Sequence, residues 1–226
     1  MKRDFLKLTD LTPDEITGLL RRAMDLKAGK DAGLCPLIGK NIGLFFEKPS
    51  TRTRVSFEAG IYQLGGNAIL MSPAELQLGR GETIADTAKT LSRYLHAIMM
   101  RTFLHETLEA FARNSSIPVI NGLSDLRHPC QALADTMTLL EKKGTFEGLK
   151  LAYVGDGNNV CNSLVEAASV LGFNLAVACP EGFEPHTELL ENARAAARSE
   201  IVILRDPREA VGMACLLYTS PSPRDS

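Results

Sequence analysis

The chain has 226 residues, enough for two modest α/β domains that each bury a hydrophobic core. Its 25 basic and 27 acidic residues give a net charge of -2, so nucleic acid and acidic membranes are not expected partners. No apolar run has the length of a signal peptide or of a membrane-spanning helix, and we therefore expect a cytoplasmic protein.

The five cysteines are widely spaced, and none belongs to a C-x-x-C pair. The four histidines are equally scattered, so a metal site has almost no support in the sequence. We expect reduced thiols, no disulfide bond, no structural zinc and no cofactor.

Short apolar runs alternate with amphipathic segments in the first part of the chain. This alternation is typical of βαβ units and a parallel sheet. Asn121 and Gly122 are read as a turn, and residues 72–82 as an exposed polar loop. Strands are predicted at residues 41–46, 67–71, 97–100 and 118–120, and helices at residues 13–27, 83–94, 104–113 and 129–142, with a further helix capped by Ser50.

A break at residues 143–148 is the best domain boundary. Beyond it the same alternation predicts the start of a second parallel α/β layer with three strands. We expect one domain at residues 1–143, a partial second domain at 144–214 and a disordered tail at 215–226. Strands are predicted at residues 149–154, 175–178 and 201–204, and helices at residues 163–171, at 185–198 and from Asp206 onward.

Residues 50–58 read S-T-R-T-R-V-S-F-E and follow the first predicted strand. Ser50 stands where the helix should be capped, and a helix N-terminus offers unpaired backbone N–H groups and about half a positive charge. Three hydroxyls and two arginines add to this field, so we predict an anion site that binds phosphate. The alternative is an N-cap followed by a solvated basic turn. The apolar stripe of this helix is predicted to consist of Val55, Ala59, Tyr62, Phe57, Ile61 and Leu64.

Other polar residues follow the predicted strands. Ligands bind outside the carboxyl ends of parallel strands, so Arg52, Arg54, Arg101 and the residues after Ile120 should face one crevice. His128 belongs to this last group. The alternatives are a surface arginine at a strand end, a satisfied histidine at a helix start and, for Gln77 in the polar loop, a solvated side chain.

Gly155-Asp156-Gly157 follows a strand and opens a helix, as a dinucleotide fingerprint requires. However, Val160 occupies the third glycine position, and the strand from Leu175 ends at Cys179 and Pro180 with no acid at its end to hold a ribose. No G-K-[ST] sequence for a Walker A loop occurs either. The anion site is therefore expected to bind a small phosphorylated molecule that is not a nucleotide.

The sequence S-T-R-T-R-x-S-F-E at residues 50–58, together with H-P-x-Q at 128–131, resembles the signature shared by aspartate and ornithine carbamoyltransferases. M-M-R-T at 99–102, N-G-L-S-D at 121–125 and G-D-G-N-N at 155–159 resemble the ornithine members. The resemblance extends from about Phe5 to about Ala214 without large gaps. It implies two parallel-sheet α/β domains, the second incomplete, and a cytoplasmic homotrimer of arginine metabolism, in arginine biosynthesis or the urea cycle.

The resemblance also implies the site residues and the reaction. The carbamoyl group would pass from carbamoyl phosphate to the side-chain amine of L-ornithine, giving L-citrulline and phosphate. Thr53, Arg101 and His128 would hold the carbonyl oxygen, and Asn159 would contact ornithine. The residues implied for carbamoyl phosphate are Ser50, Thr51, Arg52, Thr53, Arg101, His128, Pro129, Cys130 and Gln131, with Gln77 reaching in from a neighbouring subunit.

One departure from the family lies at residues 220–223, which read S-P-S-P. In the family, the pair matching Tyr218 and Thr219 continues into a segment that contains an aspartate and a Ser-Met pair and grips ornithine. We therefore expect a C-terminally truncated or mis-assembled chain. The alternatives are a relative that acts on putrescine, an acylated ornithine or aspartate, and an inactive fragment that binds carbamoyl phosphate. The direction of the reaction stays open.

Overall fold

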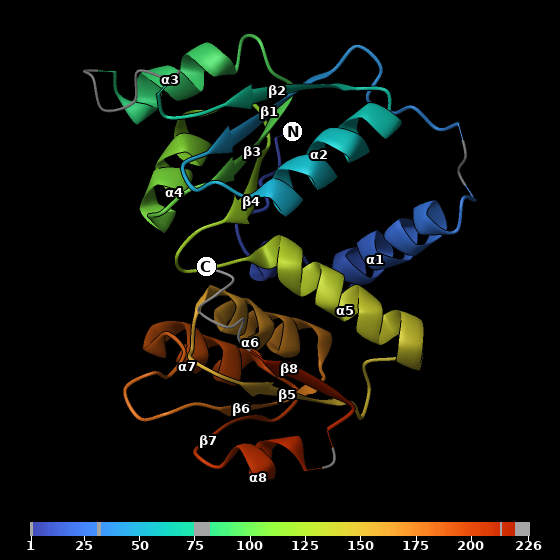
Figure 1. Ribbon diagram of the computed structural model, residues 1–226, viewed down its shortest axis with the longest axis vertical. Helices are drawn as coiled ribbons and strands as arrows, with labels where there is room; N and C mark the ends of the chain where they lie inside the picture. Colours follow the sequence, from blue (N-terminus) through green and yellow to red (C-terminus); the bar gives the residue numbers. More distant parts are fainter. Residues whose placement is uncertain (1, 31–32, 75–81, 213, 220–226) are drawn as a thin grey trace. The chain divides into compact units, whose positions relative to one another are not determined.

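The structure is a computed structural model that describes every residue except 1, 31–32, 75–81, 213 and 220–226. The chain forms two compact units, one of Met1–Leu6 with Asp25–Asp125 and one of Lys7–Met24 with Leu126–Ser226 (Figure 1). This division differs from the expected boundary at residues 143–148, because helix α5 (Pro129–Lys143) packs against helix α6 (Asn159–Leu171). The domain limits at 143 and 214 stay predictions.

The first unit is a four-stranded parallel sheet with the strand order β2-β1-β3-β4. Helix α2 covers one face, while α3 and α4 cover the other (Figure 1). The expected parallel α/β class is confirmed. The elements are β1 (Asn41–Phe46), α2 (Thr51–Gln63), β2 (Asn67–Met71), α3 (Ile84–Leu91), β3 (Ala97–Arg101), α4 (His105–Asn114) and β4 (Val119–Leu123).

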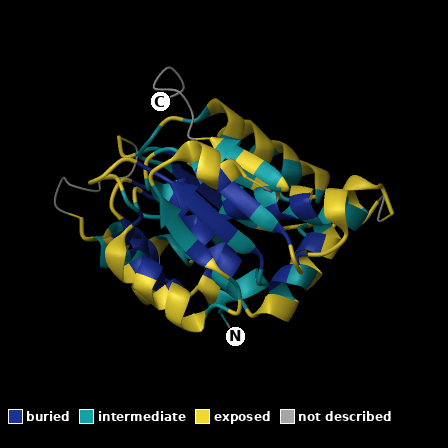
Figure 2. Cartoon of the chain, turned by 90° about the horizontal axis from the view of Figure 1, so that it is seen from below, coloured by how far each residue is buried: buried dark blue, intermediate teal, exposed yellow. Residues whose placement is uncertain are grey.

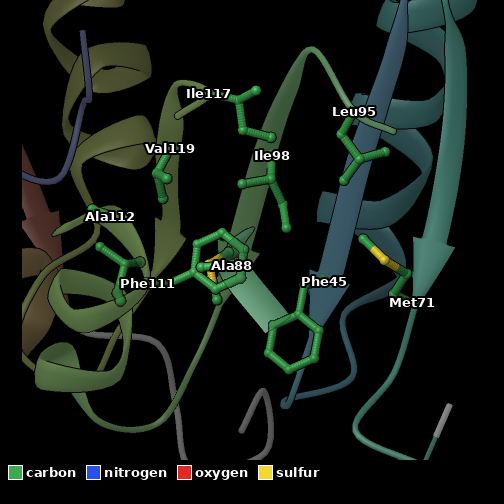
Figure 3. Packing of buried hydrophobic residues seen from close by; sticks show 11 residues of the cluster. Phe45, Met71, Ala88, Leu95, Ile98, Phe111, Ala112, Ile117 and Val119 are labelled. Atoms are coloured by element: carbon green, nitrogen blue, oxygen red, sulfur yellow. The ribbon is translucent and has the colours of Figure 1, made fainter. Parts of the chain in front are cut away.

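The core of this unit has one apolar layer on each face of the sheet. Phe45 and Ile98 pack with Phe111 of α4 on one face, as Figure 3 shows, whereas Leu44 and Met99 pack with Ile61 of α2 on the other. Neighbouring strand residues face opposite layers because side chains alternate along a strand. Figure 2 colours the chain by burial and shows buried segments (dark blue) bordered by helices and loops with exposed residues (yellow).

Two details of the first unit contradict the sequence-based expectations. Asn121 and Gly122 do not form a turn, because β4 continues through Leu123. The pairing with β3 shifts at Gly122, between Asn121 opposite Met100 and Leu123 opposite Arg101, and a Cβ on Gly122 would lie 2.3 Å from Met99 Sδ. The apolar stripe of α2 is also narrower than predicted, since Val55 and Tyr62 are 55% and 81% exposed.

The second unit is another parallel sheet, with the order β7-β6-β5-β8. Helices α6 and α7 pack together, and α6 contacts β6 and β7. Helix α8 contacts β5, β6 and β7, and it covers the opposite face of the sheet from α6 and α7 (Figure 1). With α5 and α6, the elements are η1 (Leu8–Asp10), α1 (Pro13–Lys27), β5 (Lys150–Val154), β6 (Asn174–Ala178), α7 (Thr187–Ala196), β7 (Ile201–Leu204), α8 (Pro207–Val211) and β8 (Leu216–Thr219).

Strand β8 corrects the expectation of three strands and of a tail without structure from residue 215. Its residues Leu216–Thr219 pair in parallel with β5, and residues 220–226 lie outside the described part of the chain. Helix α6 begins at Asn159, four residues before the predicted start at 163, because Asn158 caps it. None of the described helices is long and apolar enough to cross a membrane.

Candidate active site

The turn from β1 into α2 builds a capped helix N-terminus. Ser50 is the N-cap residue, and its hydroxyl oxygen accepts a hydrogen bond from the Thr53 backbone N–H at 3.4 Å. The same Ser50 hydroxyl donates to Thr53 Oγ1 at 2.9 Å. The local sequence produces this arrangement because Pro49 ends the strand and serine is among the best N-cap residues. The cap aligns two hydroxyls at the positive end of the helix dipole.

Arg101 reaches the same place from the neighbouring strand. It is the last residue of β3, lies opposite Phe46 in the register with β1, and donates from Nη1 to Thr53 Oγ1 at 3.5 Å. Desolvation by burial lowers the pKa of this guanidinium below its ordinary value. Its buried Nε has no hydrogen-bond partner among the described residues. The structure thus brings Ser50, Thr53 and Arg101 together, with donor capacity left at Arg101.

The residues between β1 and α2 are held by contacts that the sequence reasoning missed. The Glu47 carboxylate accepts a hydrogen bond from Phe103 N at 2.8 Å, and Glu47 N donates to Arg101 O at 2.8 Å. Lys48 forms an ion pair with Asp125, and its Nζ lies 4.6 Å from the Phe103 ring centroid. In the sequence, these contacts are signalled only by the two charged residues, Glu47 and Lys48, that directly follow the buried strand β1. These contacts fix the main chain that leads into the Ser50 cap.

The two arginines of the helix itself lie elsewhere. Arg54 Nε is 3.2 Å from Glu58 Oε1 in an exposed i,i+4 ion pair. The sequence predicted that Arg54 would face the same crevice as Arg101, but the structure pairs it with Glu58 instead. Arg52 is exposed in the first turn. Thr51 and Arg54 line a cavity of about 520 Å³ whose other walls include Val55 and Leu70. Gln77 lies outside the described residues.

The second predicted group of site residues belongs to the second unit. His128 is the N-cap residue of α5, and its backbone N–H donates to Ser163 Oγ at 2.8 Å. Pro129 occupies the first helical position, which needs no N–H donor. Gln131 Nε2 donates to Asp135 Oδ1 at 2.9 Å. Proline after histidine is the sequence signal that correctly predicted the start of this helix.

Cys130 follows Pro129, and its environment determines its chemistry. Burial raises the pKa of its thiol to about 12, so Cys130 is a neutral thiol rather than a thiolate nucleophile. No group of three or more histidine, cysteine, aspartate or glutamate side chains suited to a metal ion occurs in the part of the chain that the structure describes.

Asn159 is the first residue of α6, in the same unit as His128. The Asn158 side chain caps the helix by accepting hydrogen bonds from Val160 N at 3.0 Å and Cys161 N at 3.3 Å. The Tyr153 hydroxyl donates to Asp156 O at 2.9 Å and fixes the preceding turn. Asn159 is therefore held at the start of a capped helix, whereas the sequence predicted the helix only from residue 163.

The Asp135 carboxyl should make the free energy of unfolding depend on pH. Desolvation raises the pKa of its carboxyl to about 6, although the hydrogen bond from Gln131 opposes this shift. Because the ordinary pKa is about 3.9, protonation of Asp135 stabilises the folded state at low pH, and this stabilisation is lost as pH rises through about 6. Asp135→Asn should therefore raise the free energy of unfolding by up to about 2 kcal/mol at pH 8 and by much less at pH 4.5.

Urea titrations at the two pH values measure this difference. The matched control is Glu188→Gln, which changes an exposed carboxylate on α7. A stabilisation by Asp135→Asn that is the same at both pH values would show that Asp135 is not protonated in this range.

Comparison with known proteins shows where this architecture belongs. A family model described as "Aspartate/ornithine carbamoyltransferase, carbamoyl-P binding domain" matches residues 3–141. A second, described as "Aspartate/ornithine carbamoyltransferase, Asp/Orn binding domain", matches residues 147–221.

Relatives named ornithine carbamoyltransferase match nearly the whole chain. One from Syntrophus aciditrophicus is 50% identical over 221 residues, which are 97% of this chain and 73% of that relative. One from Bacillus thuringiensis subsp. konkukian is 54% identical over 220 residues, covering 96% of this chain and 69% of that relative.

Solved structures agree in fold. Ornithine carbamoyltransferase from Pyrococcus furiosus matches with a TM-score of 0.93 and 48% identity, covering 98% of this chain and 72% of that one. The Thermus thermophilus protein of the same name matches with a TM-score of 0.90 and 41% identity, covering 100% and 76% of the two chains. The chain therefore belongs to the aspartate/ornithine carbamoyltransferase family.

Proposed function

We propose that this chain transfers the carbamoyl group of carbamoyl phosphate to the side-chain amine of L-ornithine, giving L-citrulline and phosphate. One observation carries the proposal. Ser50, Thr53 and Arg101 meet at the N-terminus of α2 in a chain that is 50% and 54% identical to proteins named ornithine carbamoyltransferase. The cluster supplies the phosphate site, and the relatives indicate the amine substrate.

The phosphate group would bind where α2 begins. The free N–H groups of the first helical turn point along the axis, and the dipole favours a negative charge. Arg101 adds a full positive charge, because a guanidinium stays protonated at neutral pH even with its pKa lowered. Hydrogen bonds to charged groups contribute roughly 1.5 to 3 kcal/mol each. The binding of phosphate would satisfy the guanidinium that the fold leaves partly unpaired.

The reaction needs stabilisation of charge more than a nucleophile from the protein. The neutral amine nitrogen of ornithine attacks the carbamoyl carbon, and the bond from that carbon to the phosphate oxygen breaks. The proton released by the nitrogen goes to the departing phosphate. Thr53, Arg101 and His128 are proposed to stabilise the negative charge on the carbonyl oxygen, where one donor contributes about a hundredfold to a thousandfold in rate.

The remaining assignments rest on the family resemblance. Asn159 is proposed to contact ornithine, and Gln77 to act on a neighbouring subunit of a homotrimer. The protein is proposed to work in the cytoplasm in arginine metabolism, in arginine biosynthesis or the urea cycle. The other residues proposed for carbamoyl phosphate are Thr51, Arg52, Pro129, Cys130 and Gln131.

Incubation of the purified chain with carbamoyl phosphate and L-ornithine should produce citrulline, measured colorimetrically. Calorimetry with carbamoyl phosphate alone should show a binding heat. Parallel reactions with L-aspartate, putrescine and N-acetylornithine test the alternative amines. Binding without any product would contradict the proposed activity and leave a carbamoyl phosphate binder, whereas product from another amine alone would reassign the substrate.

A further inference from the structure

Helix α6 holds three consecutive residues of the segment before α5. Asn162 Nδ2 donates to Leu126 O at 3.0 Å, and His128 N donates to Ser163 Oγ at 2.8 Å. Between them, Arg127 Nε donates to Glu166 Oε1 at 2.8 Å. The segment therefore contacts α6 through both main-chain and side-chain bonds, and α5 packs beside α6 in this unit (Figure 1).

These α6 side chains are buried and hydrogen-bonded. Asn162, Ser163 and Glu166 are 3%, 0% and 4% exposed. Asn162 Oδ1 also accepts from His186 N at 3.0 Å, and Glu166 Oε2 accepts from Leu8 N at 3.3 Å. Polar groups at this depth are costly unless they are paired, so the contacts define one arrangement of the segment.

The ion pair between Arg127 and Glu166 is the contact of this segment that a substitution can remove without changing the main chain. The Arg127 and Glu166 side chains are 14% and 5% exposed, so the loss of either partner leaves a poorly hydrated charge. A cavity of about 130 Å³, lined by Lys7, Arg127, Glu166 and Asn192 among others, adjoins the pair. An Arg127 side chain without its carboxylate has room to turn into this cavity. Such a turn would pull on the main chain of His128, the next residue.

We infer that Glu166 is a positioning residue that acts through Arg127 and, with Asn162 and Ser163, holds His128 against the helix that begins at Asn159. The inference rests on the proposed function, in which His128 donates to the carbonyl oxygen and Asn159 contacts ornithine. A single capped helix then sets the place of one residue for each substrate. Small displacements matter in such a site, because a misplacement of about 1 Å costs on the order of a hundredfold in rate.

The test compares two ligands that differ at the carbonyl group. Carbamoyl phosphate has the oxygen that His128 is proposed to bind, whereas inorganic phosphate lacks it. In Glu166→Gln and Arg127→Met we expect the Kd of carbamoyl phosphate to rise about tenfold and that of inorganic phosphate to change less than twofold, by calorimetry. Arg127→Met keeps the carboxylate that accepts from Leu8 N, so an effect shared by both variants does not come from the loss of that bond.

Hydrogen exchange provides an independent measurement. The His128 amide should exchange at least about tenfold faster in both variants, because its bond to Ser163 opens more often, while the amide of Leu164 in the middle of α6 keeps its rate. Glu191→Gln, at an exposed carboxylate on α7, is the matched control and should change neither measurement.

The double variant Arg127→Met with Glu166→Met separates positioning from folding. Removal of both charges should restore stability but not the preference for carbamoyl phosphate. Recovery of both would overturn the inference, as would unchanged affinities and unchanged His128 exchange in the single variants. If the unmodified chain itself does not prefer carbamoyl phosphate to phosphate, the proposed function fails, and the exchange rates alone then decide whether the α6 contacts position His128.

Discussion

Arg101→Met is expected to lower citrulline formation by about 100- to 1000-fold without unfolding the chain. Within the described residues, the Arg101 guanidinium donates a hydrogen bond to the Ser50–Thr53 cap, from Nη1 to Thr53 Oγ1 at 3.5 Å. In the proposed mechanism it serves both the phosphate and the carbonyl oxygen. The loss of one such preorganised donor typically costs this much in rate.

The same substitution should leave the free energy of unfolding unchanged or raise it by about 1 kcal/mol. Burial lowers the pKa of Arg101, and its buried Nε has no hydrogen-bond partner in the described part of the chain. A buried polar group without a partner costs about 1 to 3 kcal/mol, and methionine fills much of the same volume without a charge. Opposite effects on stability and activity identify a group that the fold holds in place for a ligand.

Urea unfolding, carbamoyl phosphate calorimetry and citrulline formation measure the three quantities on one preparation. Arg93→Met changes an exposed arginine of the same unit and should alter none of them. Full activity in Arg101→Met would remove Arg101 from the site, and a loss of activity that is matched by a loss of folded protein would make its role structural.

The elements predicted well are those whose signals lie within the element. Strand β1 was predicted from an apolar run ended by Pro49, and helix α2 from the cap at Ser50. The errors concern contacts between distant segments. Strand β8 depends on pairing with β5, and β4 continues past Gly122 because Asn121 and Leu123 pair with Met100 and Arg101 of β3. A short window of sequence contains neither fact.

The same distinction applies to the candidate site. The rule that ligands bind at the carboxyl ends of parallel strands correctly placed Arg101 near Thr53. The partner of Lys48 is Asp125, and the partner of Arg127 is Glu166, both far along the chain. Because charged residues at such separations pair only in the folded protein, the sequence gives no sign of these partners.

Gly157 belongs to a glycine motif, but packing of the main chain explains why this position is a glycine. The sequence G-D-G at residues 155–157 has the look of a nucleotide loop, yet the backbone of Glu184 and Pro185 lies directly against Gly157. A Cβ at this position would lie 2.2 Å from Glu184 C and 2.2 Å from Pro185 N. Gly157 N also donates to Phe183 O at 2.7 Å. Close packing of two main chains therefore requires the glycine.

Gly157→Ala is expected to lower the free energy of unfolding by at least about 3 kcal/mol, because a clash with main-chain atoms is not relieved by a side-chain rotation. The matched control is Gly18→Ala in α1, in the same unit, where no atom lies within 4 Å of the added Cβ. That substitution should raise stability by about 0.5 to 1 kcal/mol, since alanine favours a helix over glycine. Urea unfolding of both variants measures the contrast.

Gly157→Ala should also weaken ornithine binding, because Gly157 lies two residues before Asn159. Relief of the clash requires the turn at Gly157 to move away from the backbone of Glu184 and Pro185. If the turn moves, Asn158 must lose its capping bonds to Val160 and Cys161 or carry α6 with it. The KM for ornithine should therefore rise by at least about tenfold in whatever protein remains folded. A stable Gly157→Ala chain with an unchanged KM would mean that the turn moves without displacing Asn159, and the rigid connection from the glycine turn to α6 would then be wrong.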